Sequence, residues 1–241
     1  YIADQIFPIV PVDFQSGKFV TYDESHWFRN EARLRAPGTK SQRGGWTYSS
    51  DTYYCDRFSY GHEIYDEDRA NADAAFNLDR EATEFVTDKI LMQREVSAAA
   101  KFFTTSVWGA DKTGGSNFTV WSDYANSNPI TDIAAWMDAV EASIGREPNT
   151  LVIGKQVWTQ LKWHPDLIDN IKYTHTAQLS RELVAAMLEV DRILVGRAIY
   201  TASPEGTAEA SVSYSRVWGK NALLLYVPQA PSVRTPAAGY T

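Results

Sequence analysis

The longest regular hydrophobic pattern in the chain runs from residue 78 to residue 106. Apolar side chains recur there at alternating spacings of four and three residues, which is the repeat of one helix face, and Lys89 is the one polar break. They are Leu78, Ala82, Phe85, Met92, Val96, Ala99 and Phe103. Asn77 can cap the first turn, where Asp79 and Glu81 suit the helix dipole. The pattern predicts one helix of about 43 Å that serves as a structural spine, with coiled-coil pairing as the alternative.

Residues 1–65 show strand and turn signals in place of a helical repeat. Pro8 and Pro11 fix φ and remove two amide donors, so residues 1–16 are predicted to form an extended arm. Residues 17–65 are predicted to form a projecting β-hairpin or loop, which cannot build a core of its own and needs a surface to lie on. Its strands are expected at residues 18–22, 46–48 and 52–60, with turns at Pro37-Gly38 and Gly44-Gly45.

Residues 131–228 alternate between helical and strand patterns, which predicts a mixed sheet covered by helices. Helices are expected at residues 132–144, 155–163, 166–173 and 178–189, and strands at residues 150–153, 193–200 and 222–227. Thr131 and Gly145 are the predicted caps of the first of these helices, and His164 is predicted to cap or pack at a helix end. Residues 109–130 are expected to be a linker with one short strand at 118–121, and residues 202–215 a mobile loop.

Composition places the chain among ordinary globular proteins. It has 241 residues, of which 44% are hydrophobic and 22% charged, and its net charge is −7. No apolar run approaches the roughly 20 residues that a membrane helix needs, so we expect no membrane partner. The acidic balance argues against a protein that holds nucleic acid by charge alone, and predicts at most weak, non-specific contact with DNA.

The residues that usually carry catalysis or bind metal ions do not form a recognisable set. Cys55 is the single cysteine, which excludes an internal disulfide framework and a cysteine-built metal site. Asp66 stands where a zinc-protease motif beginning at His62-Glu63 needs its second histidine. There is no nucleophile elbow and no phosphate-binding loop. We therefore expect no enzyme, with no catalytic residues, no metal site and no cofactor.

Charge is distributed unevenly between two segments. Between residues 29 and 43 five basic residues stand against Glu31, a net charge of +4, whereas residues 63–84 carry eight acids against two arginines, a net charge of −6. These segments can attract each other across copies of the chain; the alternative is that both are simply solvated faces. The predicted intersubunit interface comprises Arg29, Arg33, Arg35, Lys40 and Arg43, the aromatic flanks Trp27, Phe28 and Trp46, and the acids Asp66, Glu67, Asp68 and Asp73.

Four stretches, taken in order, resemble a known family. They are IADQIFPIVPV (2–12), NTLVIGKQVWTQLKWHPDLIDNIKY (149–173), RILVGRAIYTAS (192–203) and VWGKNALLLYVP (217–228). Together with the basic loop and the spine helix they resemble the major capsid protein of tailed bacteriophages, whose fold is shared with encapsulin shells and the herpesvirus capsid floor. The resemblance covers nearly the whole chain, and it rests on the order of the parts because no single motif is diagnostic.

The resemblance implies an α+β fold of the phage major-capsid type, with an N-arm, an extended β-hairpin loop, a long spine helix in a peripheral domain, and a mixed α/β axial domain. The implied divisions are the N-terminal arm 1–16, the extended loop 17–65, the peripheral domain 66–130, the axial domain 131–228 and a C-terminal return to the peripheral domain, 229–241.

The function implied is that of a structural subunit, which self-assembles into hexamers and pentamers of an icosahedral head enclosing double-stranded DNA. Its expected partners are further copies of itself and the portal, scaffolding and decoration proteins, and its expected location is the virion, after assembly in the host cytoplasm. An encapsulin-like cargo shell is the first alternative. A carbohydrate-active hydrolase with an aromatic groove is the second, but it would need paired carboxylates in a pocket.

Overall fold

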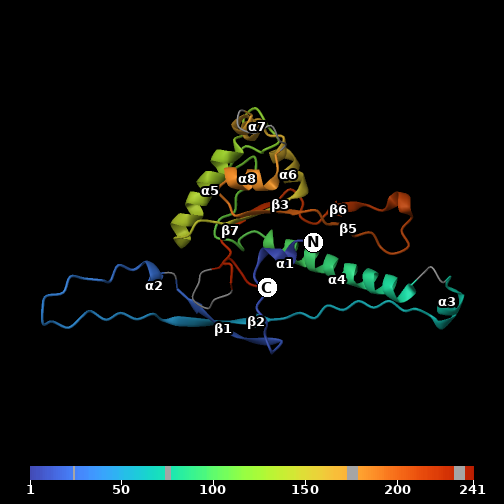
Figure 1. Cartoon of the computed structure of the whole chain (residues 1–241), viewed down its shortest axis with the longest axis horizontal. Helices are drawn as coiled ribbons and strands as arrows, with labels where there is room; N and C mark the ends of the chain where they lie inside the picture. Colours follow the sequence, from blue (N-terminus) through green and yellow to red (C-terminus); the bar gives the residue numbers. More distant parts are fainter. Residues whose placement is uncertain (24, 74–76, 173–178, 231–236) are drawn as a thin grey trace.

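A computed structural model describes residues 1–23, 25–73, 77–172, 179–230 and 237–241, with Trp27 described by its backbone alone. Figure 1 shows two parts: a body of helices on a small sheet, and below it a long, thin ribbon that extends beyond the body on both sides. Both termini lie near the centre, where the amide of Val10 donates to the Thr241 carbonyl at 2.8 Å.

The ribbon consists of strands β1 (Ser16–Tyr22) and β2 (Tyr48–Tyr54), which pair antiparallel from Ser16↔Tyr54 to Tyr22↔Tyr48. Most of its side chains are exposed on both faces. The strand predicted at 18–22 is therefore confirmed, but those predicted at 46–48 and 52–60 are wrong in extent, because one strand covers the gap between them. The length of β2 is set by its partner strand: Tyr54 pairs with Ser16, the first residue of β1, so β2 ends there.

Two segments lead away from the ribbon in opposite directions (Figure 1). On one side residues 25–47, which contain the short helix α2 (Ser25–Phe28), form a loop that extends far from the body. On the other side residues 55–65 run out to α3 (Asp66–Asn71), from which α4 returns to the centre. The two ends of the molecule are thus the tip of this loop and the helix α3.

The predicted spine helix is α4 (Leu78–Phe102). The Asn77 side chain caps it by accepting a hydrogen bond from the Arg80 amide at 3.1 Å, as predicted. It ends at Phe102, short of residue 106. Its apolar stripe is covered unevenly: Ala99 is buried, whereas Phe85 is 43% exposed.

A three-stranded mixed sheet forms the centre of the body, which confirms the predicted mixed sheet. Strand β3 (Thr150–Gly154) is buried along its whole length, lying parallel to β4 (Arg192–Gly196) and antiparallel to β7 (Ala222–Leu225). Figure 1 shows the helices above the sheet and α1 and α4 below it; the first group is α5 (Pro129–Ile144), α6 (Lys155–Lys162), α7 (Pro165–Ile171) and α8 (Arg181–Met187).

Successive side chains of β3 point to opposite faces of the sheet, so they belong to two different hydrophobic cores. Leu151 and Ile153 pack in the larger core with side chains from α5 to α8. Val152 packs on the opposite face with the N-terminal helix α1 (Ala3–Ile6), the end of α4, and Trp218. The second core therefore joins the N-terminal arm and the spine helix to the sheet.

Three predicted details at helix ends have different outcomes. The cap of α5 is Asn128, whose side chain accepts from the Thr131 amide at 3.2 Å, so Thr131 was the wrong cap; Pro129 occupies the first turn, where it needs no donor. Gly145 ends α5 in the left-handed conformation, as predicted. His164 is confirmed as a cap: it is buried, and its Nδ1 accepts from the Asp166 amide at 3.3 Å.

Other predictions are corrected by the fold. The strand expected at 193–200 is divided into β4 and β5 (Ile199–Thr201), and β5 pairs antiparallel with β6 (Tyr214–Arg216). The loop expected at 202–215 is present as the connection between β5 and β6; its last two residues belong to β6, and it contains the 3-10 turn Glu209–Ser211. No strand forms at 118–121 in the described chain; the Phe118 and Trp121 rings pack on Trp136 instead. The last predicted helix shortens to α8, and its expected first residue, Gln178, lies outside the described residues.

Candidate assembly surfaces

The basic loop presents its charges to solvent. All five predicted basic residues are exposed. Arg29 forms an ion pair with Glu31 at 3.3 Å, and Arg35 donates to the Thr39 carbonyl at 2.8 Å across a turn. Leu34, which precedes the turn at Pro37-Gly38, has a relative exposure of 105%, so its side chain contacts almost nothing in its own chain. The loop therefore combines an uncovered apolar side chain with a net positive charge.

Hydrogen bonds close the base of the loop, and one aromatic ring contacts the body. His26 and Thr47 hydrogen-bond across it at 2.8 Å, and the Asp23 carboxylate accepts from the Ser25 amide at 2.9 Å. That hydrogen bond and the Ser25 hydroxyl lower the pKa of Asp23 from its usual value. Phe28, although 59% exposed, lies against Gly145 at the end of α5. Phe28 therefore has a contact within the chain, which sequence reasoning had assigned only to a neighbour.

The acidic residues lie at the opposite end of the molecule (Figure 1). Asp66, Glu67 and Asp68 form the first turn of α3, and all three are exposed, as is Asp73. An ion pair of 2.6 Å between Arg69 and Asp79 links α3 to α4. The two predicted halves of the interface thus lie at opposite ends of the chain, and among the described residues no ion pair joins a basic loop residue to an acid of α3.

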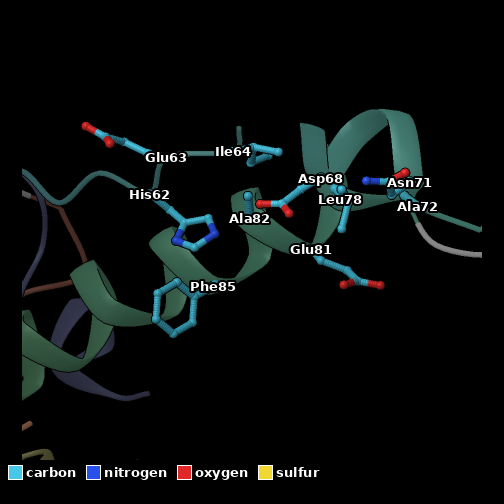
Figure 2. Close-up of a pocket in the computed structure, with 10 residues that line it drawn as sticks. All are labelled: His62, Glu63, Ile64, Asp68, Asn71, Ala72, Leu78, Glu81, Ala82 and Phe85. Atoms are coloured by element: carbon cyan, nitrogen blue, oxygen red, sulfur yellow. The ribbon is translucent and has the colours of Figure 1, made fainter. Parts of the chain in front are cut away.

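A groove lies beside these acids, between residues 62–72 and the first turns of α4 (Figure 2). Its volume is about 590 Å³. The apolar lining is Ile64, Ala72, Leu78, Ala82 and Phe85, and the polar lining is His62, Glu63, Asp68, Asn71 and Glu81. The rings of His62 and Phe85 meet edge to face at 5.7 Å, and the Asp68 carboxylate reaches toward Ala82, whereas Glu63 points away. Sequence reasoning missed this groove, although it is lined by the first part of the predicted apolar stripe.

Glu95 is a second feature that sequence reasoning missed. It is 1% exposed, in the half of α4 that faces the sheet. One carboxylate oxygen accepts hydrogen bonds from the amides of Ile2 and Ala3, and the other from the indole of Trp218. An ion pair between Arg94 and Asp4 lies beside it. Glu95 therefore connects the spine helix to the N-terminal arm and to the turn before β7. Its spacing, three residues after Met92 and four before Ala99, could have marked it as an acid on the buried face.

Two further features of the described residues concern membrane spans and metal ligands. No helix in the described ranges is long and apolar enough to cross a membrane. In the same part of the chain, no three residues among the histidines, acids and cysteine are grouped to hold a metal ion. Cys55 is exposed just beyond β2, and His175 lies outside the described residues.

The known proteins to which the chain is similar come from phages. The chain is 28% identical to the major capsid protein of Burkholderia phage BcepMu in an alignment 250 residues long, gaps included. The alignment covers 100% of this chain and 77% of that protein. It is also 28% identical to the major capsid protein of Pseudomonas phage JBD67, over 93% of this chain and 71% of that one. No family model matches the sequence.

Solved structures agree with this result. A phage-related protein from Bordetella bronchiseptica superposes with a TM-score of 0.69 and 28% identity, over 99% of this chain and 76% of that one. The capsid structure of cyanophage P-SCSP1u superposes with a TM-score of 0.53 over 94% of this chain and 72% of that one; at 13% identity this likeness concerns the fold alone. The predicted resemblance to tailed-phage major capsid proteins and the predicted α+β capsid fold are confirmed, and the comparisons support a structural capsid subunit.

Proposed function

We propose that this chain is the structural subunit of a tailed-phage head, and that it self-assembles into hexamers and pentamers of an icosahedral shell around double-stranded DNA. The observation that carries the proposal is the similarity to two phage major capsid proteins over 93% of the chain or more. Because both curated relatives belong to phages, the phage head is favoured over an encapsulin-like cargo shell. The relatives are named as structural proteins, which favours a non-enzymatic role.

The surface area of the isolated chain supports assembly. A compact monomer of 27.0 kDa is expected to expose about 10,800 Å². This chain exposes 17240 Å². The excess of roughly 6,400 Å² corresponds to several standard interfaces, each of which buries about 800 Å² per partner. A seven-residue ribbon with both faces exposed is at best marginally stable alone, so neighbouring copies would supply the missing surface.

Within a shell the parts would have separate roles. The arm 1–16 and the loop 17–65 would reach over neighbouring subunits, residues 66–130 would form the peripheral domain, residues 131–228 would surround the capsomer axes, and residues 229–241 would return to the periphery. The subunit would reside in the virion after assembly in the host cytoplasm. Portal, scaffolding and decoration proteins would be its other partners, and its net charge of −7 would keep contact with packaged DNA weak.

The two charged ends suit a head-to-tail contact between subunits. The basic loop and the acidic α3 lie at opposite ends of one chain, an arrangement that supports a contact between adjacent copies (Figure 1). A head-to-tail contact of this kind closes into a ring when its rotation fits. An exposed ion pair contributes only ~0–1 kcal/mol, so we assign the charges to register and the aromatic flanks to affinity.

Electron microscopy of the purified chain tests the proposed function. Negative-stain images, with light scattering on the same sample, are expected to show closed shells or capsomer rings. Monodisperse monomers of about 27 kDa at high protein concentration, across a range of salt and pH, would contradict it. Because exposed charges contribute to the contact, assembly should weaken in high salt without disappearing.

A further inference from the structure

We propose that Phe28 is a latch within the subunit. Its ring lies against Gly145 at the end of α5, and this contact sets the direction in which the loop 25–47 leaves the body. When the ring leaves Gly145, the loop is released and changes direction as one piece. The inference goes beyond the proposed function, because it concerns the conformation of one subunit before any neighbour binds.

Gly145 meets two separate requirements. It ends α5 with a φ of 64°, in the left-handed conformation that favours glycine. A β-carbon at this position would also lie 2.5 Å from Cε1 and 2.8 Å from Cζ of Phe28, so the ring occupies the space where any other side chain would begin. Asparagine tolerates the left-handed conformation but not this close approach. The two requirements can therefore be separated by a single substitution.

The body holds Gly145 in place from two sides. Its amide donates to the Glu141 carbonyl at 2.7 Å, in the last turn of α5. The next residue, Arg146, donates to the Tyr226 hydroxyl at 3.0 Å, and its guanidinium lies 5.4 Å from the centre of the same ring. Tyr226 directly follows β7, so the glycine is tied to the central sheet as well as to α5. A ring that rests on this glycine takes its position from the body.

The base of the loop is closed independently of this contact. His26 and Thr47 hydrogen-bond across it at 2.8 Å, and Phe28 follows two residues later in the same short helix. The Asp23 carboxylate accepts from the Ser25 amide at 2.9 Å, which ties α2 to the end of β1. These hydrogen bonds do not involve the ring of Phe28. The loop base therefore stays together when the ring is released, and the loop moves as a unit.

The latch is small enough to open. Phe28 is 59% exposed, so less than half of its surface is covered. Apolar stabilisation scales with the area removed from water, and this ring therefore contributes less than a fully buried aromatic ring would. Figure 1 shows that the loop extends far beyond α2, so a small rotation at α2 moves its far end a long way. A partner that binds the released loop more tightly than the latched loop would shift the population toward release.

Electron–electron double resonance on the full chain tests the latch. Cys55→Ser removes the natural cysteine, and nitroxide labels are attached at Lys40→Cys in the loop and Asp138→Cys on α5, both of which are exposed. The labelled chain is diluted with unlabelled chain, so the measured distances lie within one subunit. The parent chain is expected to give one narrow distance peak.

Two variants open the latch from opposite sides. Phe28→Leu keeps an apolar side chain but removes the Cε and Cζ atoms that reach Gly145. Gly145→Asn keeps the left-handed end of α5 but places a β-carbon where the ring lies. Each should lose the narrow peak and give a broad distribution. The matched control is Phe19→Ala, which shortens a partly exposed aromatic side chain on β1 and should leave the peak unchanged.

The combined variant separates a latch from two unrelated effects. Because Phe28 and Gly145 share one contact, the variant with both changes should be no broader than either alone. A narrow peak in either single variant, a broad distribution in the parent chain, or further broadening in the combined variant would overturn the inference. Circular dichroism identifies a variant that has not folded, and the other variant then decides. None of these outcomes depends on whether the chain forms shells, so the proposed function stands or fails separately in electron micrographs.

Discussion

Removing the buried carboxylate of Glu95 should destabilise the body of the protein more than removing any exposed acid of the same helix. The side chain accepts hydrogen bonds from two backbone amides of the N-terminal arm and from the Trp218 indole. A hydrogen bond to a charged group contributes about 1.5–3 kcal/mol, and a buried donor left without a partner adds its desolvation cost. Because one carboxylate serves all three donors, the separate contributions are not additive.

The two substitutions at this position should differ in size. Glu95→Gln keeps one oxygen for the arm amides but turns an amide N–H toward the indole N–H, so we expect a loss of about 1.5–3 kcal/mol in the free energy of unfolding. Glu95→Ala leaves all three donors unpaired, and we expect about 3–5 kcal/mol. At roughly 2–4 °C per kcal/mol for a chain of this size, Glu95→Gln should lower Tm by roughly 3–12 °C.

The assay is equilibrium unfolding of the unassembled chain in guanidinium, followed by tryptophan fluorescence. Hydrogen exchange of the Ile2 and Ala3 amides reports the arm separately, and it should accelerate most in Glu95→Ala. The control is Glu84→Gln, which removes an exposed ion pair with Arg80 on the same helix and should change stability by less than about 0.5 kcal/mol. If the Glu95 variants unfold at the same guanidinium concentration as this control, Glu95 does not hold the arm and the reasoning is refuted.

Two further predictions concern the contact between subunits and the packing of the sheet. Reversing Arg33 and Arg35 to Glu should block shell formation with the fold intact by circular dichroism, and reversing Asp66 and Asp68 to Lys in the same chain should partly restore it; normal assembly of the first variant in electron micrographs would contradict the proposed interface. Gly196→Ala should destabilise the chain by about 1–3 kcal/mol in guanidinium unfolding, because its added methyl group would overlap the buried indole packed on that glycine; unchanged stability would show that the indole can shift.

Much of the fold follows from local patterns in the sequence. The spine helix begins at the predicted residue because Asn77 caps it and the apolar repeat starts there. Strand β3 was predicted from a short, continuous apolar run, and its burial on both faces explains why that run does not alternate. Gly145 ends α5 as predicted because a left-handed residue at a helix end favours glycine.

The errors arise where tertiary contacts decide the outcome. The run from residue 193 to 200 has the composition of one strand, but Trp218 packs against Gly196 and the chain leaves the sheet there, so two strands form. In the sequence Glu95 resembles any polar residue on a long helix. Its hydrogen-bond donors come from the N-terminal arm, and Ala3 is 92 residues away from it in the sequence. The groove could not be predicted because it depends on how residues 62–72 lie across α4.

The spine helix connects these observations, because the two halves of its apolar stripe are covered in different ways. The half near Ala99 is covered from within the chain by the arm and the sheet, and Glu95 ties those elements together. Among the described residues, the half near Phe85 is lined by the extended segment before α3 and by α3 itself, and Phe85 stays 43% exposed. A helix with one stripe covered in two ways can fold as part of a stable body and still offer apolar surface to a neighbour. The same apolar repeat that makes α4 a helix would then also direct assembly. The chain's own arm and sheet cover one end of the stripe, and a second subunit would cover the other.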